Sequence, residues 1–170
     1  AHCHVTGRRI SMAMRAATAL TGHMGLELNL LTEREADLMQ LKAAITLHKQ
    51  HRSLLHDGDI YRLDTAVHHL ASGVVARDKS EALFSFSYMT GDQHVLPGRL
   101  QFAGLDPARR YHLALIWPEG WQAVKAPSLI EKLDLSGSGA VFNGAALMQA
   151  GMQLPHAQPE TCLLFHLKAV

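Results

Sequence analysis

One stretch, residues 6–31, constrains the fold most, because it contains a helix with apolar residues on most of its circumference. The helix is expected over residues 10–22, where only Arg15, Thr18 and Thr21 interrupt the apolar surface. The apolar residues that follow Ile10 include Met12, Met14, Ala16, Ala17, Ala19, Leu20 and Met24. A helix that is apolar nearly all round has to be covered on several sides. We therefore expect part of its cover to come from residues outside this chain, which would make the chain a fragment.

Composition and charge limit the classes of partner. The 170 residues suffice for one domain, or for a small helical piece and one β-domain. The 16 basic and 15 acidic residues are well mixed, which predicts neither nucleic acid nor a membrane surface as partner. No apolar run approaches the roughly 18 residues of a membrane span. Cys3 and Cys162 lie at opposite ends, which speaks against a disulfide framework and predicts a cytoplasmic location.

A second helix is predicted to follow the first. Thr32 and Glu35 have the spacing of a capping box, which marks a helix start. One side of this helix carries a stripe formed by Leu38, Leu41, Ile45 and His48. The helix should therefore lie on the surface and end near residues 52–55. Three histidines lie on or just past its last turns: His48, His51 and His56. They lack the i, i+4 spacing of a zinc-binding helix, so we expect them to be solvated.

From residue 57 onward the apolar period changes from helical to two, which is typical of half-buried strands. In residues 82–88, Phe84, Phe86 and Tyr88 share one face. In residues 111–117, one face is predicted to carry Tyr111, Leu113, Leu115 and Trp117. Further short strands are expected at residues 60–63, 74–75, 99–102, 133–135, 152–154 and 161–168. Short strands without helical crossovers predict an antiparallel β-sandwich over residues 57–170, and hence an α+β chain.

Four blocks in the right order carry a resemblance to a known family. They are HVTGRRISMAMRAATALTGHMGLELNLL, LHKQHRSLLHDGDIYRLD, LPGRLQFAGLDPARRYHL and LMQAGMQLP. Together they resemble the C-terminal part of bacterial α-galactosidases of glycoside hydrolase family 36. The resemblance implies that residues 1–56 are the last loop and helices of a (β/α)8 catalytic barrel, and that residues 57–170 are the antiparallel β-sandwich domain after it.

The first residues carry the one candidate for contact with a sugar. His4 and the following Thr6-Gly7-Arg8 match the family pattern His-x-Thr-Gly-Arg, which the resemblance places at the rim of the barrel's catalytic mouth. His4 either touches sugar or only orders this loop, and we favour ordering. A metal site at His2, Cys3 and His4 is not expected, because structural zinc sites usually have four ligands in two spaced pairs and no second pair follows.

The resemblance also predicts the function. The parent protein would be a retaining hydrolase that releases terminal α-linked galactose from oligosaccharides, without a cofactor or metal. Its two catalytic aspartates come from earlier barrel strands, so no residue of this chain is expected to be catalytic and the chain alone should be inactive. The α-galactoside would be bound through the missing barrel, and a homo-oligomer remains open.

The alternative function is a free-standing β-sandwich that binds carbohydrate or serves as a scaffold. Flat faces for a sugar ring would come from Trp117, Trp121 and Tyr88, of which Trp121, in a turn, is the one expected to be exposed. Since most aromatic residues fall on inward positions of the strands, we favour the enzyme fragment.

Overall fold

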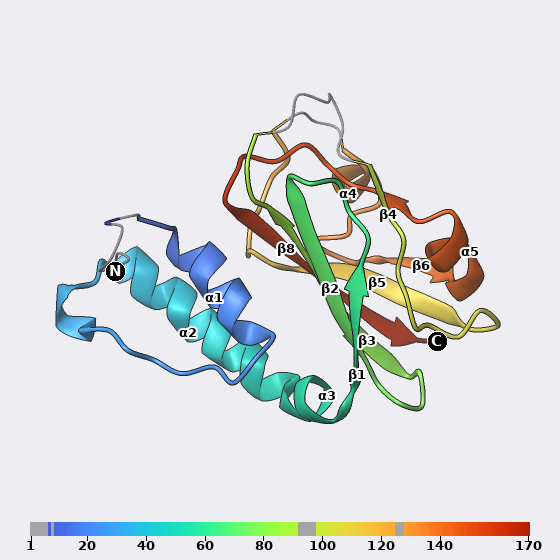
Figure 1. Cartoon of the computed structure of the whole chain (residues 1–170), viewed down its shortest axis with the longest axis horizontal. Coiled ribbons are helices and arrows are strands. Elements are labelled where there is room, and N and C mark those ends of the chain that lie inside the picture. The colour runs from blue at the N-terminus through green and yellow to red at the C-terminus, as the bar shows by residue number, and fades with distance from the viewer. Residues whose placement is uncertain (1–6, 8, 92–97, 125–127) are drawn as a thin grey trace.

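The computed structural model describes residues 7, 9–91, 98–124 and 128–170. Within them the chain forms three layers (Figure 1). A helical layer contains α1 (Met12–Leu20), α2 (Glu35–Gln50) and α3 (Arg52–Asp57). It packs on one face of a six-stranded sheet. The opposite face carries a layer of short elements: β4 (Arg99–Leu100), α4 (Leu129–Lys132), α5 (Gly144–Gln149) and β7 (Met152–Gln153). No helix in the described ranges is long and apolar enough to cross a membrane.

Helix α1 obtains much of its cover from this chain, but Ala13 and Ala19 are only half-buried, so the cover expected from outside the chain stays a prediction. It lies against α2 and against β8 (Thr161–Ala169). The residues that this packing buries are Met12, Met14, Ala16, Ala17 and Leu20. At the N-terminus, the Ser11 hydroxyl accepts a hydrogen bond from the Met14 amide at 3.2 Å, as an N-cap residue does. The position of α1 between a helix and a sheet therefore explains why most of its surface is apolar.

The predicted capping box at Thr32 and Glu35 is wrong. Thr32 belongs to a short 3-10 helix, η1 (Leu30–Thr32), and its hydroxyl donates to the carbonyl of Asn29 at 2.9 Å. The Asn29 side chain in turn accepts from the Leu31 amide, so local side-chain bonds form a turn ahead of the helix. Helix α2 begins after Arg34 without a side-chain cap. Its buried residues include Leu41 and His48, as the predicted stripe requires.

The large sheet is antiparallel throughout, in the order β1-β2-β3-β8-β5-β6. Its other strands are β1 (Asp59–Leu63), β2 (His69–Val75), β3 (Glu81–Tyr88), β5 (Arg110–Trp117) and β6 (Ala140–Asn143). Strands β1 and β6 are edges, so the sheet is open. Among the described residues, the second sheet of the expected sandwich consists of the pair β4–β7. The antiparallel part of the prediction is confirmed, while α4 and α5 supply much of the facing layer.

The first core lies between the large sheet and the layer of short elements. Phe84, Phe86 and Tyr88 of β3 all point into it, as the alternation predicted. Phe84 meets Phe102 edge to face, with ring centroids 4.9 Å apart. This geometry is favourable for aromatic pairs.

The helix-facing core lies on the other side of the sheet. Leu83, Val74 and Leu164 are buried there beneath the helices, together with Cys162. Ser85 lies on the same side, and its hydroxyl is 3.0 Å from that of Ser72. The sheet is therefore buried on both faces in its centre, whereas the alternation of Phe and Ser had indicated a half-buried strand.

Trp117 lies on the opposite face from the predicted one. The ladder between β5 and β8 shifts register between Leu115 and Trp117, where Leu115 pairs with Phe165 and Trp117 with Leu164. Such a bulge adds one residue to one strand and so reverses the parity of its side chains. Trp117 therefore enters the helix-facing core, where its indole N–H donates to the carbonyl of Ala13 in α1 at 3.1 Å.

One smaller prediction also differs from the structure. Residues 133–135, expected as a strand, form turns after α4. Helix α4 itself begins at a capping arrangement in which the Ser128 amide donates to the Glu131 carboxylate at 2.7 Å. The strand in this region is β6, which follows the turn and pairs with β5.

Replacement of Phe86 should show which face of β3 carries the first core. Phe86 is 3 % exposed, so Phe86→Ala should lower the free energy of unfolding by about 3–5 kcal/mol. Ser85→Ala, on the other face, should cost about 1 kcal/mol through its hydrogen bond with Ser72. Urea denaturation of both variants measures the difference, and equal losses would contradict the assigned faces.

Replacement of Trp117 tests the docking of the helices. Trp117→Phe keeps a ring in the helix-facing core but removes the hydrogen bond to Ala13, so we expect a loss of about 1–2 kcal/mol. Trp121→Phe is the matched control, because Trp121 is half-buried beside the first core and should change less. Chemical denaturation followed by circular dichroism compares the two, and a larger loss in the control would contradict the docking role of Trp117.

Candidate functional site

The residues proposed from the sequence do not assemble into a sugar site in the described part of the chain. His4, with His2 and Cys3, lies outside the described residues. Trp117 and Tyr88 are both 3 % exposed and present no flat face to solvent. Trp121, expected to be exposed, is half-buried against the first core.

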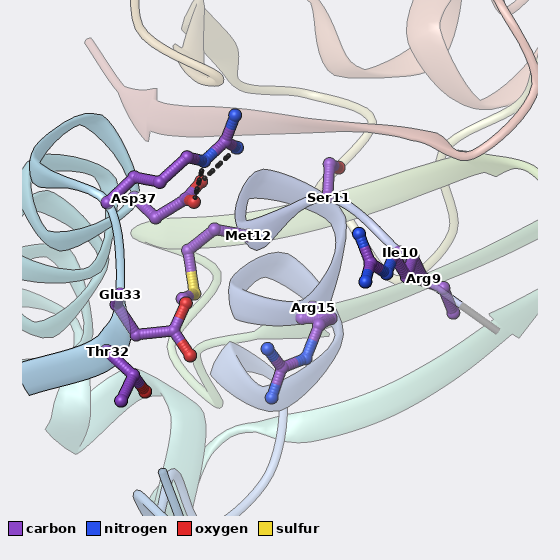
Figure 2. A pocket seen from close by; sticks show the side chains of 9 residues that line it. Arg9, Ile10, Ser11, Met12, Arg15, Thr32, Glu33 and Asp37 are labelled. Atoms are coloured by element: carbon purple, nitrogen blue, oxygen red, sulfur yellow. Dashed lines mark hydrogen bonds and ion pairs between the residues drawn. The ribbon is translucent and has the colours of Figure 1, made fainter. Parts of the chain in front are cut away.

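A pocket of about 570 Å³ opens where α1 begins, directly after the segment that the resemblance places at the catalytic mouth (Figure 2). Its walls come from two segments that are distant in the sequence. Arg9, Ile10, Ser11, Met12 and Arg15 line one side, and Thr32, Glu33, Arg34 and Asp37 line the other. The pocket is thus formed by the docking of α1 on the start of α2.

The charged groups of this pocket are partly paired with each other. Arg34 donates from Nε and Nη2 to the two carboxylate oxygens of Asp37, at 2.7 and 3.1 Å. This hydrogen bonding holds the pKa of Asp37 below its ordinary value. The Arg34 side chain is 82 % exposed, so solvent screens the pair and it contributes little to stability. Arg9 and Arg15 extend from the α1 side, which makes the rim a surface for hydrogen bonding to polar groups of a ligand or of another protein segment.

The carboxyl groups that have a displaced pKa in the described ranges differ from the acid that protonates a leaving group. Within the described ranges, each carboxyl group with a displaced pKa is displaced downward: Asp37, Asp78, Glu81 and Asp134. The general acid of a glycosidase needs the opposite shift, because it must stay protonated until the bond breaks.

The sequence analysis missed a polar cluster between the helical layer and the sheet. Glu81 Oε1 lies 3.1 Å from Nδ1 of His51 and 2.7 Å from Nε2 of His166. The two imidazole rings have centroids 4.7 Å apart. These residues are far apart in the sequence, and no local spacing signals their convergence.

Three histidines were expected to be solvated. The expectation is confirmed for His56 and is wrong for His48 and His51. His56 is exposed, whereas His51 is bound to Glu81 and His48 is 9 % exposed. His48 follows the apolar stripe of α2 inward, so helical geometry buries it despite its polarity.

Cys162 is a free, buried thiol on β8. Burial raises its pKa to about 11. Since the thiolate is the reactive form, such a thiol should be nearly inert near neutral pH.

By its fold, the chain is a module that combines helices with an antiparallel sheet. Comparison with known families identifies the family to which it belongs. Residues 69–167, more than half of the chain, match the family described as "Glycosyl hydrolase family 36 C-terminal domain". Residues 1–58 match the family described as "Melibiase". The chain therefore belongs to glycosyl hydrolase family 36, as the four sequence blocks indicated.

Curated relatives match the chain over nearly its whole length. An alpha-galactosidase of Escherichia coli is 34 % identical over 169 residues, which cover 98 % of this chain and 24 % of the relative. Alpha-galactosidase AgaA of Geobacillus stearothermophilus is 26 % identical over 170 residues, with 98 % and 20 % covered. The chain thus spans about a quarter or less of the length of these relatives.

Solved structures share the fold. The family 36 alpha-galactosidase AgaB of Geobacillus stearothermophilus superposes with a TM-score of 0.78 at 28 % identity, over 98 % of this chain and 20 % of that one. The galactosidase domain of alpha-galactosidase-sucrose kinase AgaSK has a TM-score of 0.79 at 24 % identity, over 98 % and 21 %. The similarity to AgaSK shows a shared fold alone.

The buried thiol gives a test of the helical cover. In a Cys3→Ser background, Cys162 of the native chain should react with a thiol reagent far more slowly than in denaturant, because it is buried and its pKa is raised. Absorbance of the released thiol chromophore measures both rates. Equal rates in native and denaturing buffer would mean that the helices do not cover β8.

Proposed function

We propose that this chain is the C-terminal part of an α-galactosidase that hydrolyses terminal α-linked galactose with retention of configuration. The observation that carries the proposal is that 98 % of the chain matches curated alpha-galactosidases while it spans only 24 % or less of their length. A variant of AgaA of Geobacillus stearothermophilus is described in complex with raffinose, which supports an oligosaccharide as substrate class.

In this proposal the chain divides into two parts with different tasks. Residues 1–56 are the last loop and helices of a (β/α)8 catalytic barrel, and residues 57–170 are the β-domain that follows. Two observations support the division: separate family matches at residues 1–58 and 69–167, and the change from helices to strands after α3. The pocket rim with Arg9, Arg15 and Arg34 then faces the rest of the enzyme.

The chemistry would reside outside this chain. A retaining glycosidase uses two carboxyl groups about 5–5.5 Å apart, one as nucleophile and one as acid/base. In the described part, Asp37 is bound by Arg34, which holds its pKa below the ordinary value, opposite to what a general acid needs. The chain would therefore support the barrel and be inactive alone. A role for His4 at the catalytic mouth and a cytoplasmic location remain predictions.

The alternative of a free-standing carbohydrate-binding module has less support. Its two candidate stacking residues Trp117 and Tyr88 are buried, and Trp121 packs on the first core. Sugar-binding aromatic residues need an accessible face.

An activity assay tests the proposal. The purified chain should release no chromophore from an aryl α-galactoside, whereas the longer enzyme that contains this sequence should turn it over. Magnetic resonance of the first product should show the α-anomer of galactose, because retention proceeds through a covalent intermediate.

Two outcomes would contradict the proposal. A longer enzyme that does not cleave α-galactosides would overturn the assigned activity. Turnover by the chain alone that survives repurification, and is lost in Glu33→Gln or Asp37→Asn, would place the chemistry in the pocket of Figure 2.

A further inference from the structure

Three side chains of the kind that bind metals meet at the junction of the helical layer with the sheet. His51 lies at the break between α2 and α3, Glu81 begins β3, and His166 lies on β8. Their nearest ligand atoms all lie within 4.8 Å of one another. In the described ranges no other three His, Cys, Asp or Glu residues come so close.

The distances fit a metal site after small side-chain movements. Nδ1 of His51 and Nε2 of His166 both point at Glu81 Oε1, at 3.1 and 2.7 Å. Around a tetrahedral zinc ion with bonds of about 2.0–2.2 Å, neighbouring ligand atoms are about 3.3 Å apart. The two nitrogens thus need to move slightly away from the oxygen and toward each other. We propose that His51, Glu81 and His166 form a binding site for a divalent transition-metal ion of the zinc class.

Two imidazole nitrogens and one carboxylate oxygen are a ligand set that zinc accepts. In the metal-free chain, each neutral ring uses its single N–H to donate to Glu81. On metal binding, each ring moves this proton to its other nitrogen, so both facing nitrogens present lone pairs and no proton is released. The carboxylate supplies one negative charge to the ion.

Burial and neighbouring groups act on the charge of the cluster. Burial holds the pKa of His166 below its ordinary value. Burial raises the pKa of Glu81, but hydrogen bonding and electrostatic interaction with His166 and His51 outweigh this effect, and the net pKa is lowered. Lys168, opposite Glu81 in the strand register, is the cation that opposes metal binding.

The cluster is held by rigid elements but remains within reach of solvent. The side chains of His51, Glu81 and His166 are 12 %, 35 % and 19 % exposed. A hollow of about 460 Å³ beside Glu81 is also lined by Asp57, Asp78 and Ser80, and gives an ion a path to the carboxylate. A water molecule can fill the fourth position. Because the ligands come from both layers, a bound ion would tie the helices to the sheet and stabilise the folded chain.

Zinc titration of the full chain tests the site. The background carries His2→Gln, Cys3→Ser and His4→Gln, because this stretch could chelate zinc by itself. Calorimetry with zinc chloride near neutral pH should give one saturable site, lost in His166→Gln and in Glu81→Gln. His68→Gln is the control, since the His68 ring lies 2.9 Å from the Thr90 hydroxyl, at the opposite end of β3 from Glu81. Binding in the control should equal that of the background.

Two further readouts separate a metal site from a purely hydrogen-bonded cluster. Zinc should raise the melting temperature of the background chain, a chelator should reverse the rise, and neither effect should occur in His166→Gln. Cobalt should give a visible absorption band that disappears in His51→Gln, which also serves if His166→Gln fails to fold. Absence of saturable zinc binding in the background chain, or binding that persists in folded His51→Gln and His166→Gln, would overturn the proposal.

Discussion

The burial of the central strand β8 on both faces is the constraint on which the rest of the structure depends. Leu163, Phe165 and Leu167 enter the first core, while Cys162 and Leu164 enter the helix-facing core. The sequence of a strand that is buried on both faces is a nearly continuous apolar run, and residues 162–165 form such a run. Such a strand requires a layer on each side. The helices and the short elements therefore stabilise the same sheet from opposite faces.

This arrangement joins the two parts that the sequence separates into a helical and a β region. Trp117 reaches α1 through its bond to Ala13, and His51 at the end of α2 bonds to Glu81 in the sheet. Docking of α1 on α2 also forms the pocket of Figure 2, because its two walls come from the starts of these helices and the segments just before them. In the proposed enzyme, the β-domain would thereby set the position of the last barrel helices and of the loop that carries His4.

Features that depend on neighbouring residues were predictable from the sequence, and features that depend on distant residues were not. The helices, the faces of β3 and the last strand follow from local periodicity. The face of the sheet on which Trp117 lies depends on a bulge in β5 against β8. The burial of α1 depends on which elements pack against it. The predicted capping box at Thr32 does not form, because the Asn29 side chain makes a competing local hydrogen bond with the Leu31 amide. For the sites, the four blocks indicated the family, but His51, Glu81 and His166 converge only through the tertiary fold.

Native-state hydrogen exchange measures most directly whether the helices and the sheet form one cooperative unit. The slowest amides of α2 should exchange with the same free energy as those of β3 and β8, because separation of the helical layer exposes the helix-facing core around Leu164 and Trp117. Exchange of all α2 amides through a separate opening of lower free energy, with β8 still protected, would contradict the account.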